Sequence, residues 1–309
     1  MSAQPNDDYR EAERRLWVHY GATPKEHFLD LESARLRVRV QEVGTGDPVL
    51  FVHGAPNSGS TWAPLVASLP DFRCLLLDRP GTGLSEVLDY TSVDMRARAV
   101  DVLTSVLAAL GIDRLPIVAS SAGGAWTFWL TLARPDAVTR MVQMGCPALV
   151  SGMQTPGFMR LLALPGLGSL IARLPASRGA GRSTMRQLGH GPSVDAGRIP
   201  DPLWEWSYHL NRDTPTMRSE VALITRGLTW RGAVRPEVEL RDEELRRIQQ
   251  PTLFLWGEDD PFGGPELARH LASIMPNATL ELFPNSGHLP WLDNPATFAL
   301  RTRAFLQAR

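Results

Sequence analysis

The chain has 309 residues, of which 43% are hydrophobic and 21% are charged, an ordinary balance for a globular protein. Its 32 basic and 33 acidic residues nearly cancel and form no basic patch, so we expect no nucleic-acid partner. No apolar run approaches the roughly 18 residues that a membrane span needs, and the polar N-terminus does not resemble a secretory signal. The two cysteines cannot form a disulfide framework. We therefore expect a cytoplasmic protein. We expect it to be a monomer or a homodimer.

The first part of the chain predicts a short arm followed by strands. Residues 1–25 are polar with some helical character, and we interpret them as an N-terminal arm. Segments 27–31 and 35–43 alternate apolar and polar residues, which is typical of half-buried strands. The continuous apolar run 48–54 indicates a strand that is buried on both faces.

A repeated strand–helix pattern then predicts a parallel sheet. Short apolar runs indicate further strands, and stretches with helical spacing indicate the helices between them. The predicted strands are 74–78, 115–120, 138–144, 252–257 and 279–283, and the predicted helices are 92–110, 122–133, 265–275 and 295–307. The fold class is therefore α/β, with a mostly parallel eight-stranded sheet flanked by helices.

Residues 147–235 interrupt this pattern. The stretch is rich in Pro and Gly, contains short helical pieces and has no segment that predicts a sheet strand. We interpret it as a helical lid inserted into an α/β core, which comprises residues 26–146 and 236–309.

Ser121 lies where a predicted strand runs directly into a predicted helix. Residues 119–123 read Ala-Ser-Ser-Ala-Gly and resemble the nucleophile elbow Gly-x-Ser-x-Gly, with Ala119 in place of the first Gly. The residues that flank the nucleophile in this sharp turn must be small. This requirement selects Ser121 rather than Ser120, which would have the larger Val118 at the first flanking position.

Several motifs at predicted strand ends together resemble the α/β-hydrolase superfamily. Within it, the resemblance is to lidded serine esterases, haloperoxidase-like enzymes and C–C hydrolases, and it covers residues 26–145 and 240–309. The chain order Ser…Asp…His is the order of that superfamily. The motifs are Val-His-Gly-Ala-Pro at 52–56, Asp-Arg-Pro-Gly-Thr-Gly-Leu-Ser at 78–85, the elbow at 119–123, Trp-Gly-Glu-Asp-Asp-Pro at 256–261 and Asn-Ser-Gly-His at 285–288.

The resemblance implies the roles of the other site residues. The backbone N–H groups of Ala55 and Ala122 would form the oxyanion hole, which stabilises the charge of an acyl-transfer intermediate. His288 would take the proton from Ser121, and Asp260 would orient the imidazole of His288. Some relatives carry the acid one strand earlier, but here no carboxylate follows that strand.

Aromatic and apolar side chains in the predicted lid, on the helix after Ser121 and beside His288 favour an apolar small-molecule substrate. The candidate contacts are Trp126, Trp204, Trp206, Tyr208 and Leu289. We therefore expect a serine hydrolase that cleaves a carboxylic ester, or a lactone, of a modest-sized apolar substrate through an acyl-enzyme, without metal or cofactor.

Other functions remain open at this point. The same residues serve amide hydrolysis, C–C bond cleavage and acyl transfer, and the pocket could also serve a non-hydrolytic ligand-binding or biosynthetic protein. Haloalkane dehalogenases and epoxide hydrolases of this superfamily use Asp as nucleophile, and Ser at position 121 argues against both.

Overall fold

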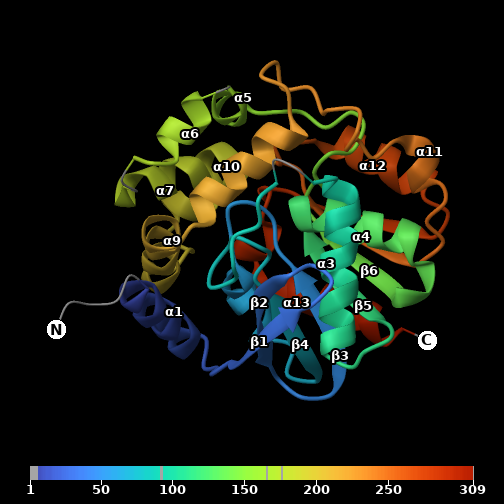
Figure 1. The fold of residues 1–309 in the computed structure, drawn as a ribbon, viewed down its shortest axis with the longest axis horizontal. Helices are drawn as coiled ribbons and strands as arrows, with labels where there is room; N and C mark the ends of the chain where they lie inside the picture. Colours follow the sequence, from blue (N-terminus) through green and yellow to red (C-terminus); the bar gives the residue numbers. More distant parts are fainter. Residues whose placement is uncertain (1–5, 91–92, 165, 175–176, 309) are drawn as a thin grey trace.

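The computed structural model describes residues 6–90, 93–164, 166–174 and 177–308. Its centre is an eight-stranded sheet in the order β1-β2-β4-β3-β5-β6-β7-β8 (Figure 1). The pairs β1–β2 and β2–β4 are antiparallel and the remaining pairs are parallel, which confirms the predicted fold class. The strands are β1 (Lys25–Leu31), β2 (Leu36–Val43), β3 (Asp47–Val52), β4 (Phe72–Leu77), β5 (Leu115–Ser120), β6 (Val138–Met144), β7 (Thr252–Gly257) and β8 (Ala278–Phe283).

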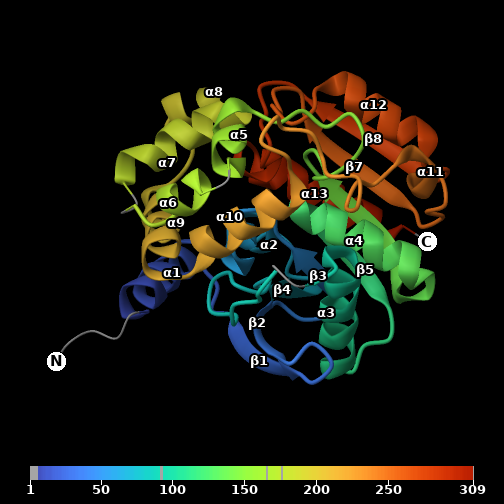
Figure 2. The ribbon, with the colours of Figure 1, turned by 45° about the horizontal axis from the view of Figure 1, so that its top comes forward.

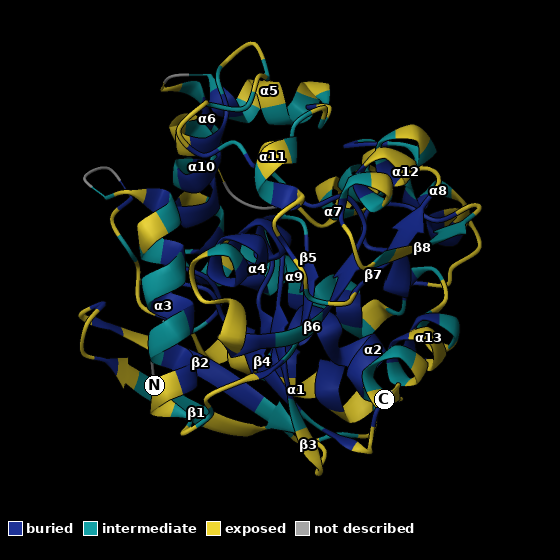
Figure 3. Cartoon of the chain, turned by 90° about the vertical axis from the view of Figure 1, so that its right-hand side faces the viewer, coloured by how far each residue is buried: buried dark blue, intermediate teal, exposed yellow. Residues whose placement is uncertain are grey.

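Helices cover both faces of the sheet, because its central strands are apolar on both sides. Successive residues of a strand point to opposite faces: in β3, Leu50 and Val52 belong to one hydrophobic core, and Val49 and Phe51 to the other. Figure 3 shows these strands buried and the outer faces of the helices exposed. One core includes α3 (Met95–Ala109), α4 (Ala122–Ala133) and α12 (Pro265–Ile274), and the other includes α2 (Ala63–Val66) and α13 (Pro295–Gln307).

The chain between β6 and β7 folds as short helices beside the carboxyl ends of the parallel strands (Figure 2). In this stretch the described residues form two isolated β-bridges and no further strand of the sheet. The helices are α5 (Gly157–Ala163), α6 (Leu167–Ile171), α7 (Arg178–Met185), α8 (Gly191–Asp195), α9 (Asp201–Asp213), α10 (Thr216–Gly227) and α11 (Asp242–Leu245).

The predicted N-terminal arm contains a helix, α1 (Asp7–His19), that packs into the molecule against α9. Tyr9, Leu16 and Trp17 of α1 are buried in the same core as α2 and α13. Residues 1–5 of the predicted arm lie outside the described part of the chain. None of the helices in the described ranges is both long enough and apolar enough to cross a bilayer.

Candidate active site

Ser121 occupies the turn between β5 and α4 with a strained backbone. Its φ of 51° and ψ of −120° lie in a region that non-glycine residues rarely adopt. The Ser121 carbonyl oxygen accepts hydrogen bonds from the N–H groups of Gly124 at 2.9 Å and Ala148 at 3.0 Å. Such outliers persist only where the surrounding structure holds them, and they cluster at functional sites.

The loop after β3 lies against this turn. A Cβ atom on Gly54 would be 2.6 Å from the Cβ of Ser121, so a larger residue would push the two segments apart. Ala119, which replaces the first Gly of the elbow, is an ordinary strand residue of β5 and pairs with Val52 of β3 and Gln143 of β6. The strained turn therefore forms with Ala at this position.

Two backbone N–H groups beside Ser121 are free to bind a ligand. Ala55 and Ala122 both line the cavity onto which Ser121 opens. Neither N–H group donates to an acceptor within the described residues. An acyl-transfer site needs donors of this kind directed at the developing oxyanion.

The His53 side chain holds the loop that carries Ala55. Burial, with Arg79 adding to it, lowers the pKa of His53 well below its usual value, so the ring is neutral. Its Nε2 accepts from the Arg79 N–H at 3.1 Å, and Nδ1 therefore donates to the carbonyl oxygen of Gly54 at 2.7 Å.

The structure brings His288 and Asp260 together. Nδ1 of His288 lies 2.8 Å from Oδ2 of Asp260, and both side chains are buried. The Asp260 carboxylate also accepts from the N–H groups of Cys146 at 2.8 Å and Phe262 at 2.9 Å. A carboxylate beside Nδ1 keeps the ring proton there, which leaves Nε2 as a proton acceptor.

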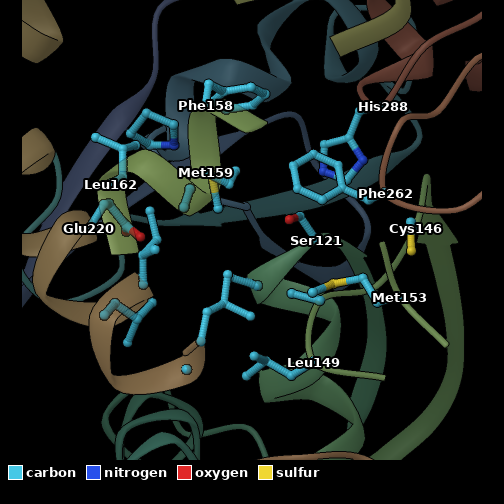
Figure 4. Close-up of a pocket in the computed structure, with 18 of the residues that line it drawn as sticks. Ser121, Cys146, Leu149, Met153, Phe158, Met159, Leu162, Glu220, Phe262 and His288 are labelled. Carbon is cyan, nitrogen blue, oxygen red and sulfur yellow. The ribbon is translucent and has the colours of Figure 1, made fainter. Parts of the chain in front are cut away.

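Ser121 and His288 line one cavity (Figure 4). Within the described residues, the Ser121 hydroxyl and the His288 ring are not hydrogen bonded to each other. Catalytic hydrogen bonds are often long in an unliganded enzyme and shorten when substrate binds.

This cavity has a volume of about 170 Å³, and most of its lining is apolar. The apolar side chains that line it come largely from α5 and α10 and from the segments after β6 and β7. They include Leu149, Met153, Phe158, Met159, Leu162, Met217, Leu223, Ile224 and Phe262.

A second cavity, of about 180 Å³, shares Ala55, Pro56 and His288 with the first. Three of the side chains that the sequence suggested as substrate contacts line it: Trp204, Tyr208 and Leu289.

Trp126 and Trp206 line neither cavity, so the structure does not support them as substrate contacts. Each side chain is only 1% exposed, because the apolar face of its helix packs inward against a hydrophobic core. The Trp126 ring packs against the Arg79 guanidinium, whose carbon lies 5.4 Å from the ring centroid.

Two features of the site escaped the sequence analysis. Glu220 of α10 lines the first cavity, and burial raises its pKa although the Arg79 guanidinium opposes this effect. The sequence did contain a signal for Glu220, because its carboxylate shares a helical face with the apolar Met217 and Ile224.

The second feature that the sequence did not reveal is a buried pair of side chains, His190 and Asp293, next to the loop that carries His288. Nδ1 of His190 lies 2.9 Å from Asp293. Burial alone would raise the pKa of Asp293, but hydrogen bonds from His190, Ser193 and the Gly287 N–H keep it below its usual value. Neither residue belongs to a motif, so no sequence signal pointed to the pair.

Among the described residues, one group of side chains is close enough to hold a metal ion. Asp8, His209 and Asp213 have ligand atoms within 4.8 Å of one another, near the surface and outside both cavities. His209 and Asp213 already form a hydrogen bond of 2.6 Å, and we assign no function to the group.

Comparisons with known proteins identify the family and the fold. The family model described as alpha/beta hydrolase fold matches residues 47–295. The 2-hydroxy-6-oxo-6-phenylhexa-2,4-dienoate hydrolase of Burkholderia cepacia is 26% identical over 284 residues, which cover 88% of this chain and 92% of that protein. A 2-hydroxy-6-oxononadienedioate/2-hydroxy-6-oxononatrienedioate hydrolase of Burkholderia vietnamiensis is 28% identical over 290 residues, 89% of this chain and 93% of that protein.

Solved structures share the fold at lower sequence identity. Carboxylesterase CesB from Bacillus subtilis superposes with a TM-score of 0.77 at 19% identity and covers 99% of both chains. The meta-cleavage product hydrolase of Pseudomonas fluorescens IP01 gives a TM-score of 0.70 at 19% identity, over 90% of this chain and 96% of that one.

Proposed function

The chain belongs to the α/β-hydrolase fold family, and from this premise we propose that it is a serine hydrolase that cleaves a carboxylic ester, or a lactone, of a modest-sized apolar substrate. The observation that carries the proposal is that Ser121 and His288 line one largely apolar cavity and that His288 is hydrogen bonded to Asp260. We further propose that residues 147–235 act as a lid over a core of residues 26–146 and 236–309.

In the proposed reaction, Ser121 Oγ attacks the ester carbonyl carbon while its proton moves to Nε2 of His288. The carbonyl oxygen becomes an oxyanion and is bound by the N–H groups of Ala55 and Ala122. The C–O bond breaks, the alkoxide takes the proton from His288, and an acyl-enzyme remains. Water then cleaves the acyl-enzyme by the same steps. His288 removes a proton from the water, the hydroxide adds to the acyl carbon, and Ser121 leaves with the proton from His288.

The proposed substrate size follows from the first cavity. A cavity of roughly 150 Å³ lined by aliphatic and aromatic side chains admits benzene, and the cavity here has about 170 Å³. An acyl group with one aromatic ring or a short alkyl chain fits this space, and the second cavity is placed to receive the alcohol part.

Ester hydrolysis by the wild type and by two serine variants tests this proposal. We expect the wild type to hydrolyse p-nitrophenyl phenylacetate or hexanoate, and Ser121→Ala to lose roughly a million-fold in kcat. The matched control is Ser120→Ala, which removes a neighbouring buried hydroxyl that has no hydrogen-bond partner within the described residues. Equal rates for Ser121→Ala and the wild type, or an equal loss in Ser120→Ala, would contradict the assignment of the nucleophile.

C–C bond hydrolysis is the second candidate, because two of the similar proteins are hydrolases whose names denote dienoate and dienedioate carboxylates. The first cavity argues against a substrate carboxylate at that position, whereas Arg178 lines the second cavity. Among the described residues that line the first cavity there is no Arg or Lys to pair with a carboxylate. Turnover of 2-hydroxy-6-oxo-6-phenylhexa-2,4-dienoate with a kcat/KM above that for the esters would place C–C bond hydrolysis ahead of ester hydrolysis.

A protein that binds a ligand without turning it over is a third candidate. A fluorophosphonate probe separates it from a hydrolase, because the probe reacts covalently only with an activated serine. We expect Ser121 to be labelled in the wild type and labelling to be absent from Ser121→Ala. A wild type that is not labelled would favour the binding protein.

A further inference from the structure

Glu220 places a carboxylate in the wall of a largely apolar cavity. Met217, Glu220 and Ile224 lie on one face of α10, at helical spacings of three and four residues, and all three line the cavity. The Glu220 side chain is 2% exposed, and Figure 4 shows it across the cavity from His288 and Phe262.

Only one of the two carboxylate oxygens of Glu220 is hydrogen bonded. Oε1 lies 2.5 Å from Nη2 of Arg79, while Oε2 is buried and has no partner within the described residues. The Arg79 guanidinium is fixed, because its Nε donates to the His53 carbonyl oxygen at 2.9 Å. Buried polar atoms are nearly always satisfied, so an unpaired oxygen in a ligand cavity requires an explanation.

Two more polar atoms near this carboxylate lack partners within the described chain, namely Nη1 of Arg79 and the hydroxyl of Tyr90. Tyr90 is buried, and the charges of both Arg79 and Glu220 act on it. Leaving such atoms unpaired is unfavourable, because their hydration is lost without replacement, and apolar substrate atoms cannot satisfy them. Of these three atoms, only Oε2 belongs to a residue that lines the cavity.

We propose that Oε2 of Glu220 accepts a hydrogen bond from a neutral hydroxyl or N–H group on the part of the substrate that fills the apolar cavity. The inference rests on the proposed function and narrows its substrate class to esters whose acyl group is apolar except for one hydrogen-bond donor. A carboxylate at the same position is disfavoured, because no cationic side chain among the described residues lines the cavity.

Matched substrates test the inference in the wild type. We would compare the p-nitrophenyl esters of the hydroxyphenylacetic acids with those of the corresponding methoxyphenylacetic acids. We expect at least one hydroxy isomer to exceed its methyl ether in kcat/KM by about 10-fold or more, since a hydrogen bond to a charged group gives a gain of this order. Equal kcat/KM values within every pair would overturn the inference and indicate that a bound water satisfies Oε2.

Glu220→Gln is the decisive variant. Its amide oxygen can still accept from Arg79, while its NH₂ group replaces the acceptor Oε2 with a donor. We expect the preference for the hydroxy ester to disappear or to reverse in favour of the methoxy ester. The control is Glu266→Gln on the exposed face of α12, which should keep the wild-type preference. An unchanged preference in Glu220→Gln would overturn the inference.

Binding without chemistry separates this inference from the proposed function. Calorimetry with phenol and anisole on Ser121→Ala measures the Glu220 contact in a protein that cannot turn over. We expect phenol to bind about 10-fold more tightly than anisole, and equal affinities would overturn the inference whether or not any ester is hydrolysed. If esters are hydrolysed through Ser121 without a hydroxyl preference, the proposed function stands and the role of Glu220 fails. If Glu220→Gln does not fold, the phenol and anisole affinities still decide.

Discussion

Asp260 lies in a ring of donors that suits a carboxylate and no other side chain. The N–H groups of Cys146 and Phe262 donate to its two oxygens, and Nδ1 of His288 lies 2.8 Å from Oδ2. The neighbouring Asp259 is exposed. The sequence indicated Asp260 by its distance from a glycine, and the structure supplies the physical reason, because only this carboxylate of the loop faces the imidazole.

Replacing the acid tests its proposed role. We expect Asp260→Asn to lower kcat by about 10⁴-fold, because an amide favours the wrong imidazole tautomer and cannot stabilise the imidazolium. The measurement is steady-state ester hydrolysis, with thermal melting to confirm that the variant is folded. Asp259→Asn is the matched control and should retain wild-type kcat. A loss below 10-fold in folded Asp260→Asn would contradict the role.

Gly54 sets how closely the β3 loop approaches the nucleophile. In Gly54→Ala the new Cβ would lie 2.6 Å from Ser121 Cβ, so either the loop or the elbow has to move. We expect kcat to fall about 100-fold, because the Ala55 N–H would shift away from the oxyanion, and KM to change little. Gly264→Ala, whose added Cβ meets nothing within 4 Å, is the control for a Gly-to-Ala change. Wild-type kcat in Gly54→Ala would show that the contact does not position the loop.

At the scale of elements, α1 is held to the sheet by buried charges. Both guanidinium Nη atoms of Arg39 in β2 bond to Glu13, at 2.6 and 2.8 Å, and Arg39 also lies 2.7 Å from Asp78. Burial alone would raise the pKa of Glu13, but Arg39 lowers it below its usual value. Tyr9 adds a hydrogen bond to Glu13 at 2.7 Å. Helix α1 of the predicted arm is thus packed into the molecule.

Breaking this contact tests the importance of α1 for stability. We expect Glu13→Ala to lower the free energy of unfolding by about 3 kcal/mol or more, because it removes two hydrogen bonds of the buried Arg39 guanidinium. Denaturant titration measures the effect. Glu11→Ala removes an exposed ion-pair partner of Arg14 and Arg15 from the same helix and should change stability little. Equal effects of the two substitutions would mean that α1 contributes only through its apolar side.

The strands and four of the helices flanking the sheet (α3, α4, α12 and α13) were predictable, because burial on both faces leaves a local mark in the sequence. The prediction for β5 gives the observed Leu115–Ser120, and those for α4 and β6 are equally close. Burial of α1 left no such mark, since its charged residues look solvated until Arg39, a residue of a distant strand, pairs with Glu13.

At the scale of the whole molecule, the helical insertion is joined to the loop that carries His288. The His288 N–H donates to the Leu188 carbonyl oxygen at 2.9 Å, and the Leu289 N–H donates to Nε2 of His190 at 3.0 Å. Gly189, with a φ of 89°, permits this approach, because a side chain there would collide with the Asp259 carbonyl oxygen.

The two cavities form where the helical insertion packs on the rest of the molecule, and the sequence could not predict which residues line them. Trp126 and Trp206 were expected to contact substrate because they are aromatic and lie on the helix after Ser121 and in the predicted lid, yet their helices turn them into the cores. Trp204, two residues from Trp206 on α9, lines the second cavity instead. Which face of a short helix meets the cavity depends on how the insertion packs, and only the structure resolves that.

The last prediction concerns His190 as a positioning residue for His288. His190→Leu removes both the acceptor for the Leu289 N–H and the donor to Asp293. We expect kcat to fall about 10-fold with KM within about twofold, because small displacements of a catalytic group cost rate more than binding. His190→Gln offers an acceptor near the position of Nε2 and should recover part of the loss. His270→Leu, an exposed histidine on α12, is the control and should keep wild-type kinetics. A merely structural role would lower the melting temperature and the active fraction while kcat per folded molecule stayed unchanged, and that result would remove His190 from the positioning of His288.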